Sequence, residues 1–302
     1  MADHHSSLKS IYYAFSANMV IAIAKTFTAV YTGSGSMMAE SVHSYADTGN
    51  QLLLLWGLKR SKKEPDSGHP LGYGKAIYFW SFIVALMLFS IGGLFSVYEG
   101  IHKVQHPTEI SNHNWALGVL FFSLIAESLS LAGALREIRK IKKNRSLWDW
   151  FKNTKRSELV VVLGEDMAAV TGLFFAMIAI GISTITGNPV YDAFGSIFIG
   201  LLLIFVAIQL GVKIKSLMIG ESASAELEAA IIRTLLDTKR VRQIYNLISI
   251  QLGFEVMLSL KVEMQEKERA EKLIDDINFC ERKIKSDFPE VKWIFFEPDN
   301  AD

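Results

Sequence analysis

The sequence is poor in cysteine and carries no net charge. Cys280 is the only cysteine among 302 residues, which excludes an intramolecular disulfide framework and a cysteine-rich zinc site. The 31 Lys and Arg balance the 31 Asp and Glu, so total charge does not indicate a nucleic-acid partner. The opening residues, MADHHSSLKS, have neither an Arg-rich transit segment nor a signal region with a small-residue cleavage site. Since Cys280 is the single cysteine, its thiol is expected to be buried and to act as a small hydrophobic group.

Hydrophobic residues, by contrast, make up half of the chain, and the mean hydropathy of +0.26 is high for a soluble domain. A bilayer core of about 30 Å requires about 20 apolar residues per helix. Segments of that length lie near residues 10–32, 36–58, 77–100, 114–136, 158–183 and 191–213. The pattern predicts a polytopic α-helical membrane protein with six transmembrane helices.

Basic residues gather in two of the loops between these segments. They are Lys59, Arg60, Lys62, Lys63 and Lys75 in one loop, and Arg139, Lys140, Lys142, Lys143, Arg145, Lys152, Lys155 and Arg156 in the other. Cytoplasmic loops carry such an excess, so both termini are expected in the cytoplasm, with Lys103 as an exception on the other side. Because the basic run 139–156 lies between two spanning segments, we expect it to contact membrane lipid headgroups and no nucleic acid.

The composition changes near residue 217. Residues 221–239 and 266–286 have helical patterns, whereas 242–253, 254–264 and 291–297 read as strands. Ile248, Ile250 and Leu252 alternate with Ser249 and Gln251 along the first strand, as a strand pattern requires. The order α-β-β-α-β predicts a ferredoxin-like α+β cytoplasmic domain over 215–302, after a transmembrane domain over 1–214. A domain this small is expected to pair with a second copy.

Ionisable residues inside the spanning segments are costly, so they indicate a functional site. His43 and Asp47 are four residues apart and therefore lie on one helix face. At 1.5 Å per residue, Asp47 is roughly 16 Å from one membrane surface and Asp166 roughly 12 Å from the other. The two depths nearly coincide in a core of about 30 Å, so His43, Asp47 and Asp166 are expected to meet as metal ligands.

Two further acids and one possible ion pair within these segments bear on this site. Glu165 and Glu127 are at a similar depth, and either could supply a fourth ligand, relay a proton, or pair with a polar group to hold the helices together. Lys25 and Glu40 lie nearer the outer surface at comparable depths. We expect these two to form an ion pair, which would offset the cost of both charges.

Three motifs resemble those of the cation diffusion facilitators, the zinc transporter family. Residues 36–47, SMMAESVHSYAD, resemble the signature of its second helix, which holds a His/Asp-x-x-x-Asp metal motif. Residues 65–75, PDSGHPLGYGK, resemble its cytoplasmic loop motif, and residues 296–298, Phe-Glu-Pro, resemble the close of its C-terminal domain. The resemblance covers nearly the whole chain. It implies a homodimer that exchanges a divalent metal ion for protons and uses no organic cofactor.

The chain departs from the family pattern in helix five. The family's usual site takes His-x-x-x-Asp from that helix; here Asp166 matches the Asp, but Val162 stands at the His position and cannot ligate. The chain thus resembles the branch of the family that has Glu-Asp and no His in helix five. Zn(II) is the expected substrate. Because more oxygen and less nitrogen makes a site harder, Mn(II), Fe(II) and Co(II) are alternatives.

The resemblance also bears on two cytoplasmic sites. Asp66 and His69 match two ligands of the family's loop site, whereas Tyr73 replaces the third, so we expect either a weak metal site or only a turn before the next helix. The family often binds regulatory zinc through histidines in its cytoplasmic domain. All seven histidines here lie at or before residue 113, so we expect no such cluster and a dimer that needs no metal.

The sequence therefore favours a zinc/proton antiporter that exports metal from the cytoplasm by alternating access, and not an enzyme. A membrane hydrolase would need a pattern such as Ser/His or His-Glu-x-x-His, which is not visible. A transport-inactive metal sensor or scaffold is an alternative, since Val162 removes a ligand; an organic-solute carrier is a weaker one. With no targeting segment visible, the expected location is a prokaryotic plasma membrane.

Overall fold

The computed structural model describes residues 18–108, 111–142, 145–265 and 269–301 of the chain. They divide into two compact units. The helical unit takes residues up to 56 together with 80–147 and 158–213, and the C-terminal unit takes 57–79, 148–157 and the residues from 214 onward. The C-terminal unit thus includes two earlier stretches, 57–79 and 148–157, as well as the tail that the sequence assigns to a separate domain.

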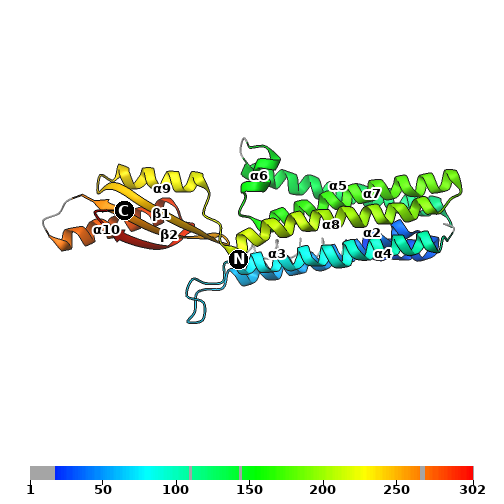
Figure 1. Cartoon of the computed structure of the whole chain (residues 1–302), viewed down its shortest axis with the longest axis horizontal. Helices are drawn as coiled ribbons and strands as arrows, with labels where there is room; N and C mark the ends of the chain where they lie inside the picture. The colour runs from blue at the N-terminus through cyan, green and yellow to red at the C-terminus, as the bar shows by residue number, and fades with distance from the viewer. Residues whose placement is uncertain (1–17, 109–110, 143–144, 266–268, 302) are drawn as a thin grey trace, which may run out of the picture. The chain divides into compact units, whose positions relative to one another are not determined.

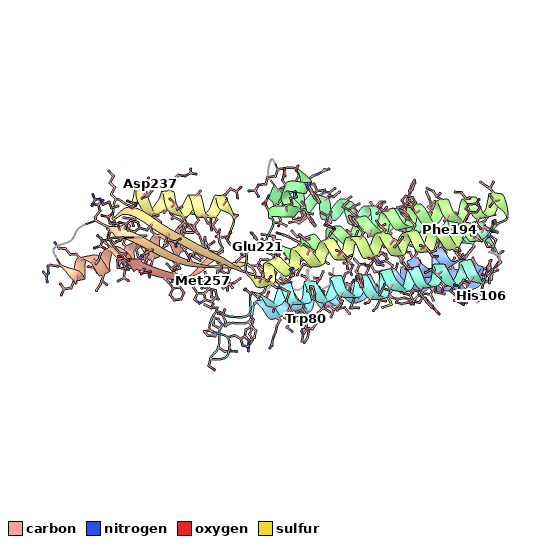
Figure 2. The ribbon with its side chains drawn as sticks, in the orientation of Figure 1. Trp80, His106, Phe194, Glu221, Asp237 and Met257 are labelled. Carbon is pink, nitrogen blue, oxygen red and sulfur yellow. The ribbon has the colours of Figure 1, made fainter. Side chains whose placement is uncertain are left out.

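The helical unit is built from long helices (Figure 1). Residues 18–32 are helical, and the elements that follow are α2 (Gly35–Ser61), α3 (Ala76–Met87), η1 (Leu88–Leu94), α4 (Phe95–Gln105), α5 (His113–Lys142), α7 (Ser157–Thr186) and α8 (Val190–Ile219). The π-helical turn η1 joins α3 and α4 into one continuous rod, and Figure 2 places Trp80 and His106 near its opposite ends. The long elements follow the apolar segments of the sequence closely.

Four helices within the described residues are long and apolar enough to cross a membrane. They are Ala76–Gln105, His113–Lys142, Ser157–Thr186 and Val190–Ile219. α2 has the length, 27 residues, but the ionisable side chains discussed above make it less apolar. The first expected segment begins at residue 10, outside the described residues, so the count of six spanning helices stays a prediction.

Glycines bring the α3–α4 rod against α8 at backbone contact. A Cβ on Gly93 would lie 3.2 Å from the carbonyl oxygen of Gly200, and a Cβ on Gly200 would lie 2.7 Å from that of Gly93. No larger residue fits at either position without moving a helix. Small residues at membrane helix contacts allow this close approach, which supports tight packing of the two elements.

A carboxylate from α8 caps the N-terminus of α2. Asp192 is buried, and its Oδ2 accepts a hydrogen bond of 2.6 Å from the backbone N–H of Gly35. Its Oδ1 accepts from the N–H of Ser36 at 3.2 Å and from the hydroxyl of Ser34 at 2.8 Å. A helix N-terminus leaves N–H groups without intrahelical partners and favours negative charge, so Asp192 satisfies both needs.

Lys103, the basic residue on the unexpected side, has a local structural role. Its ammonium donates to the carbonyl oxygen of Gly33, just after the helix of residues 18–32, and to the hydroxyl of Thr108 at 3.0 Å. A cation near the last carbonyl groups of a helix is favourable. Its place beside this helix end explains why one lysine departs from the charge pattern of the loops.

The C-terminal unit confirms the predicted order of elements. It contains α9 (Ala225–Asp237), β1 (Val241–Leu252), β2 (Glu255–Met264), α10 (Ala270–Asp287) and β3 (Val291–Pro298), as Figure 1 shows. The sheet order is β1-β2-β3, with β2 antiparallel to β1 and parallel to β3. One core packs Ile231 and Ile284 of the helices against Leu258 and Leu260 of β2. Cys280 is a free, buried thiol, and burial raises its pKa.

Burial along β1 does not follow the alternation of apolar and polar residues. Ile248 is 53% exposed, whereas Ser249 and Gln251 are buried. The Ser249 hydroxyl accepts from the N–H of Ala223 at 2.8 Å and donates to Glu228 at 2.6 Å, which offsets its burial. Register shifts earlier in the strand break the simple alternation.

Candidate functional site

A small cavity in the helical unit gathers the carboxylates that the sequence singled out. It has a volume of about 60 Å³ and is lined by Asn18, Ile21, Ser44, Asp47, Gln51, Glu127, Ser130, Val162, Glu165 and Asp166. Four of these are acids, contributed by α2, α5 and α7, and none of the lining residues is Lys or Arg. Like charges this close are costly unless protons or a bound cation neutralise them.

His43 lies beside one of these acids and not among the lining residues. Its Nδ1 is 3.4 Å from Oδ1 of Asp47, one helical turn away, and the imidazole is buried. Neither ring nitrogen has a hydrogen-bond partner within the described part of the chain. Asp47 thus contacts His43 and also lines the cavity. An imidazole whose ring nitrogens have no such partner is available to a proton or a metal ion.

The two acids of α7 are held by different partners. The hydroxyl of Ser130 donates to Oδ2 of Asp166 at 3.2 Å, across from α5. The amide Nδ2 of Asn50 donates to Oε1 of Glu165 at 2.6 Å, and both side chains are buried. Sequence reasoning missed Asn50, although its position three residues after Asp47 indicated that it shares that helix face.

The described residues do not form a closed metal site. No three His, Cys, Asp or Glu side chains among them lie close enough to hold a metal ion. Asp47 and Asp166 line one cavity, while His43 reaches it through Asp47. Carboxylate oxygens with one nearby imidazole suit hard or borderline divalent cations. Coordination by all three therefore requires these side chains to come closer together than they lie here.

Val162 also lines this cavity. The position at which the resembling family has a histidine therefore faces the carboxylates, but an isopropyl group occupies it. Glu165 and Glu127 line the same space, so either is placed to take part in binding. The missing ligand is a change of side chain at this position and not a displacement of the helix.

The expected ion pair of Lys25 and Glu40 is present. The Nζ of Lys25 is 3.3 Å from Oε2 of Glu40 and donates to the hydroxyl of Ser44 at 2.8 Å. Both charged side chains are fully buried. Glu40 lies against Gly172 of α7, where an added Cβ would be 2.7 Å from Oε1. Since Ser44 also lines the cavity, the ion pair adjoins the site.

In the C-terminal unit, a lysine forms an ion pair with the carboxylate of the loop motif. The Nζ of Lys63 lies 2.7 Å from Oδ2 of Asp66, and the hydroxyl of Tyr73 donates to the same oxygen at 2.8 Å. The backbone N–H groups of Gly68 and His69 donate to Oδ1. The hydrogen bonds from Lys63 and then Tyr73 hold the pKa of the Asp66 carboxyl well below its usual range. The Asp66 carboxylate is thus already paired with the ammonium group of Lys63.

We expect the loop to bind zinc only weakly until this lysine is removed. The double substitution Lys63→Ala and Tyr73→His frees Asp66 and adds an imidazole near His69, whose ring now lies 4.1 Å from that of Tyr73. Zinc affinity at the loop should rise at least about tenfold, which is the size of change that altering the hydrogen-bond partners of metal ligands typically produces. Calorimetry on protein carrying Asp166→Ala would measure it. Adding Asp66→Ala should remove the gain; a gain that persists would contradict this assignment.

Comparison with known proteins identifies the class of the helical unit. The family described as the cation efflux transmembrane domain matches residues 11–219. A similar protein is "Proton-coupled zinc antiporter SLC30A9, mitochondrial" of Xenopus laevis, which is 37% identical over 226 residues. The match covers 74% of this chain and 40% of that protein, so the chain spans less than half the length of that relative.

Two further relatives match a larger share of this chain. "Metal tolerance protein C4" of Arabidopsis thaliana is 31% identical over 253 residues, covering 83% of this chain and 55% of the relative. "Magnetosome protein MamB" of Paramagnetospirillum magneticum is 25% identical over 288 residues, covering 93% and 90%. Its described part holds four helices that are long and apolar enough to cross a membrane, and the family match covers most of its length. The chain is therefore an integral membrane protein and belongs to the cation efflux family.

Proposed function

We propose that the chain is a divalent metal transporter that exports zinc in exchange for protons. The observation that carries this proposal is the cavity in which acids from three helices meet, with His43 against one of them. The printed name of the Xenopus laevis relative, a proton-coupled zinc antiporter, supports the same assignment. Ligand sites shared between helices near the middle of the membrane are typical of transporters.

The proposed transport site consists of His43, Asp47 and Asp166, completed by Glu165 or Glu127. Metal enters from the cytoplasm and displaces protons from these groups, because ligands must be deprotonated to bind a metal. The helices then rock and open the site to the other side. Protons return, compete for His43 and the carboxylates, and release the metal. No enzymatic step is needed, and we assign none.

The architecture and location are proposed together. We assign six transmembrane helices, a ferredoxin-like C-terminal domain, a homodimer, and both termini in the cytoplasm, as the basic loops indicate. The α-β-β-α-β order of the C-terminal unit supports the ferredoxin-like assignment. We propose a prokaryotic plasma membrane as the location. The relatives differ on this point, since the names of two of them mention mitochondria and the magnetosome.

The oxygen-rich cavity favours a second candidate substrate class. Four carboxylates and a valine at the histidine position make the site harder than one with two imidazoles. Mn(II), Fe(II) and Co(II) are then alternatives to zinc. A metal-sensing or scaffold protein that has lost transport is the alternative of another class, and metal flux separates the two.

Proton flux driven by a metal gradient tests the proposal. Purified protein in liposomes with a pH-sensitive dye inside should give a proton flux on addition of Zn(II), Mn(II), Fe(II) or Co(II). Liposomes without protein and an ionophore-collapsed gradient are the controls. The metal with the largest flux is the substrate. A folded protein that gives no flux with any of the four would overturn the transporter assignment and favour the sensor.

A further inference from the structure

The short helix α6 (Leu147–Asn153) connects two helices that can each cross a membrane. α5 ends at Lys142 and α7 begins at Ser157, and both helices can cross the membrane. The described part of the connection, residues 145–156, therefore lies on the side of the bilayer at which α5 ends and α7 begins. An extended chain spans at most about 3.6 Å per residue, so this segment stays close to the lipid headgroups.

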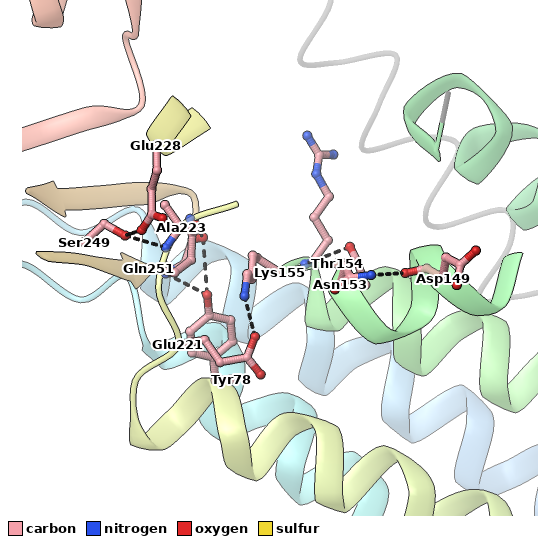
Figure 3. A network of polar contacts seen from close by, with 12 residues as sticks. Tyr78, Asp149, Asn153, Thr154, Lys155, Glu221, Ala223, Glu228, Ser249 and Gln251 are labelled. Atoms are coloured by element: carbon pink, nitrogen blue, oxygen red, sulfur yellow. Dashed lines mark hydrogen bonds and ion pairs between the residues drawn. The ribbon is translucent and has the colours of Figure 1, made fainter. Parts of the chain in front are cut away.

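One face of α6, the face that carries Trp150, is buried. Trp150 is 3% exposed, and its carbonyl oxygen accepts a hydrogen bond of 2.8 Å from the N–H of Thr154. Just beyond the helix, the ammonium of Lys155 lies 2.6 Å from Oε2 of Glu221 (Figure 3). The burial of Trp150 marks the inward side of α6, so the opposite side faces outward.

The opposite face combines aromatic and basic groups. Trp148 is 59% exposed, and its ring stacks on Phe151 with the centroids 5.6 Å apart. The Nζ of Lys152 lies 5.1 Å from the centroid of the Trp148 ring. Trp is favoured at membrane interfaces, and a lysine stem can lie along apolar surface while its charge reaches the headgroups. The outward face is therefore suited to a bilayer surface.

Charge along the segment points to the kind of lipid. Residues 139–156 contain eight Lys and Arg and one acid, Asp149. Arg156, which follows α6, is exposed, as is Lys152. Basic groups beside a membrane helix attract anionic lipids, each by about fivefold in local enrichment. Zwitterionic headgroups offer no such net attraction.

We propose that α6 is an interfacial helix that binds anionic lipid headgroups through Trp148, Lys152 and Arg156. The aromatic pair sets the depth of the helix in the headgroup layer, and the two cations select a negative headgroup. The bound partner is the bilayer that surrounds the protein, and the site stands apart from the carboxylate cavity. Its assignment does not depend on which metal is carried, or on transport at all.

Quenching of Trp148 fluorescence by brominated lipid tests both parts of the proposal. The full-length protein is placed in phosphatidylcholine vesicles containing equal mole fractions of either brominated phosphatidylglycerol or brominated phosphatidylcholine. The Trp148 signal is the difference between the wild type and Trp148→Phe. Trp150→Phe is the matched control, because Trp150 is two residues away and buried. We expect Trp148 to be quenched by both lipids, several times more strongly by the anionic one.

The charge variants complete the test. Lys152→Gln with Arg156→Gln should remove about fivefold or more of the preference for phosphatidylglycerol and leave quenching by brominated phosphatidylcholine unchanged. High salt should reduce the preference in the wild type. Equal quenching of wild-type Trp148 by the two lipids would refute anionic selection. Absence of quenching by either would refute the interfacial position and indicate that something other than lipid covers this face.

Discussion

Replacing Asp47 or Asp166 by alanine is expected to abolish metal transport. Both acids line the same cavity from different helices, and a divalent cation there needs their negative charge. The isosteric changes Asp47→Asn and Asp166→Asn remove the charge and keep the volume, so they should be nearly as damaging. We expect metal-dependent proton flux in proteoliposomes to fall by at least about 100-fold, beyond the usual effect of changing a ligand's partner.

The control for this prediction is an acid in a spanning helix outside the cavity. Glu99 of α4 lies in the span Ala76–Gln105 and is not among the cavity residues. Glu99→Gln should transport at close to the rate of the wild type. Near-normal flux in a correctly folded Asp47 or Asp166 variant would exclude that residue from the site. Loss of flux in all variants, including Glu99→Gln, would mean that carboxylates act through general electrostatics.

Lys25→Met is expected to destabilise the protein strongly, whereas Lys25→Met with Glu40→Met should not. The single change leaves the carboxylate of Glu40 buried without its cation, and removing one partner of a buried pair costs about 3–5 kcal/mol. The double change removes both desolvated charges and is expected to be neutral or stabilising. Methionine is chosen because its flexible side chain can fit the narrow space beside Gly172.

Thermal unfolding in detergent measures this difference. Lys59→Met is the matched control, because Lys59 is exposed near the end of α2 and its loss should change the melting temperature little. If the single and double variants are destabilised equally, the ion pair is not the reason these charges are tolerated. The Ser44 hydroxyl, which also accepts from Lys25, would then be the next candidate.

Depth along a helix could be predicted from the sequence, and contacts between distant segments could not. The fixed rise per residue places Asp47 and Asp166 at one level, and they do line one cavity. Whether they ligate metal stays a prediction. The sequence does not indicate that Asp192 caps the start of α2, which lies 157 residues earlier in the chain. A cap supplied by another helix leaves no local sequence pattern. The partner of Glu165 was missed for the same reason.

In the C-terminal unit, the order of elements followed from residue patterns, but one face did not. Alternation identifies β2 correctly, since Val256, Leu258 and Leu260 are all buried. It fails in β1, where Ser249 points inward because a backbone N–H and a helix carboxylate satisfy its hydroxyl. Hydrophobic alternation assumes that polar side chains face water, and it has no information about partners brought by the fold.

The start of α2 is held by contacts from two other helices, so the rest of α2 can tilt about that end. Asp192 of α8 accepts a hydrogen bond from the N–H of Gly35, and Lys103 of α4 donates one to the carbonyl oxygen of Gly33, so this end of α2 is held in place. Asp47 lies 12 residues after Gly35, about 18 Å along the helix from the held end. A tilt of about 10° would then displace its carboxylate by roughly 3 Å, given that length. A modest swing about one pinned end is thus enough to make or break contact between Asp47 and the acids of α7.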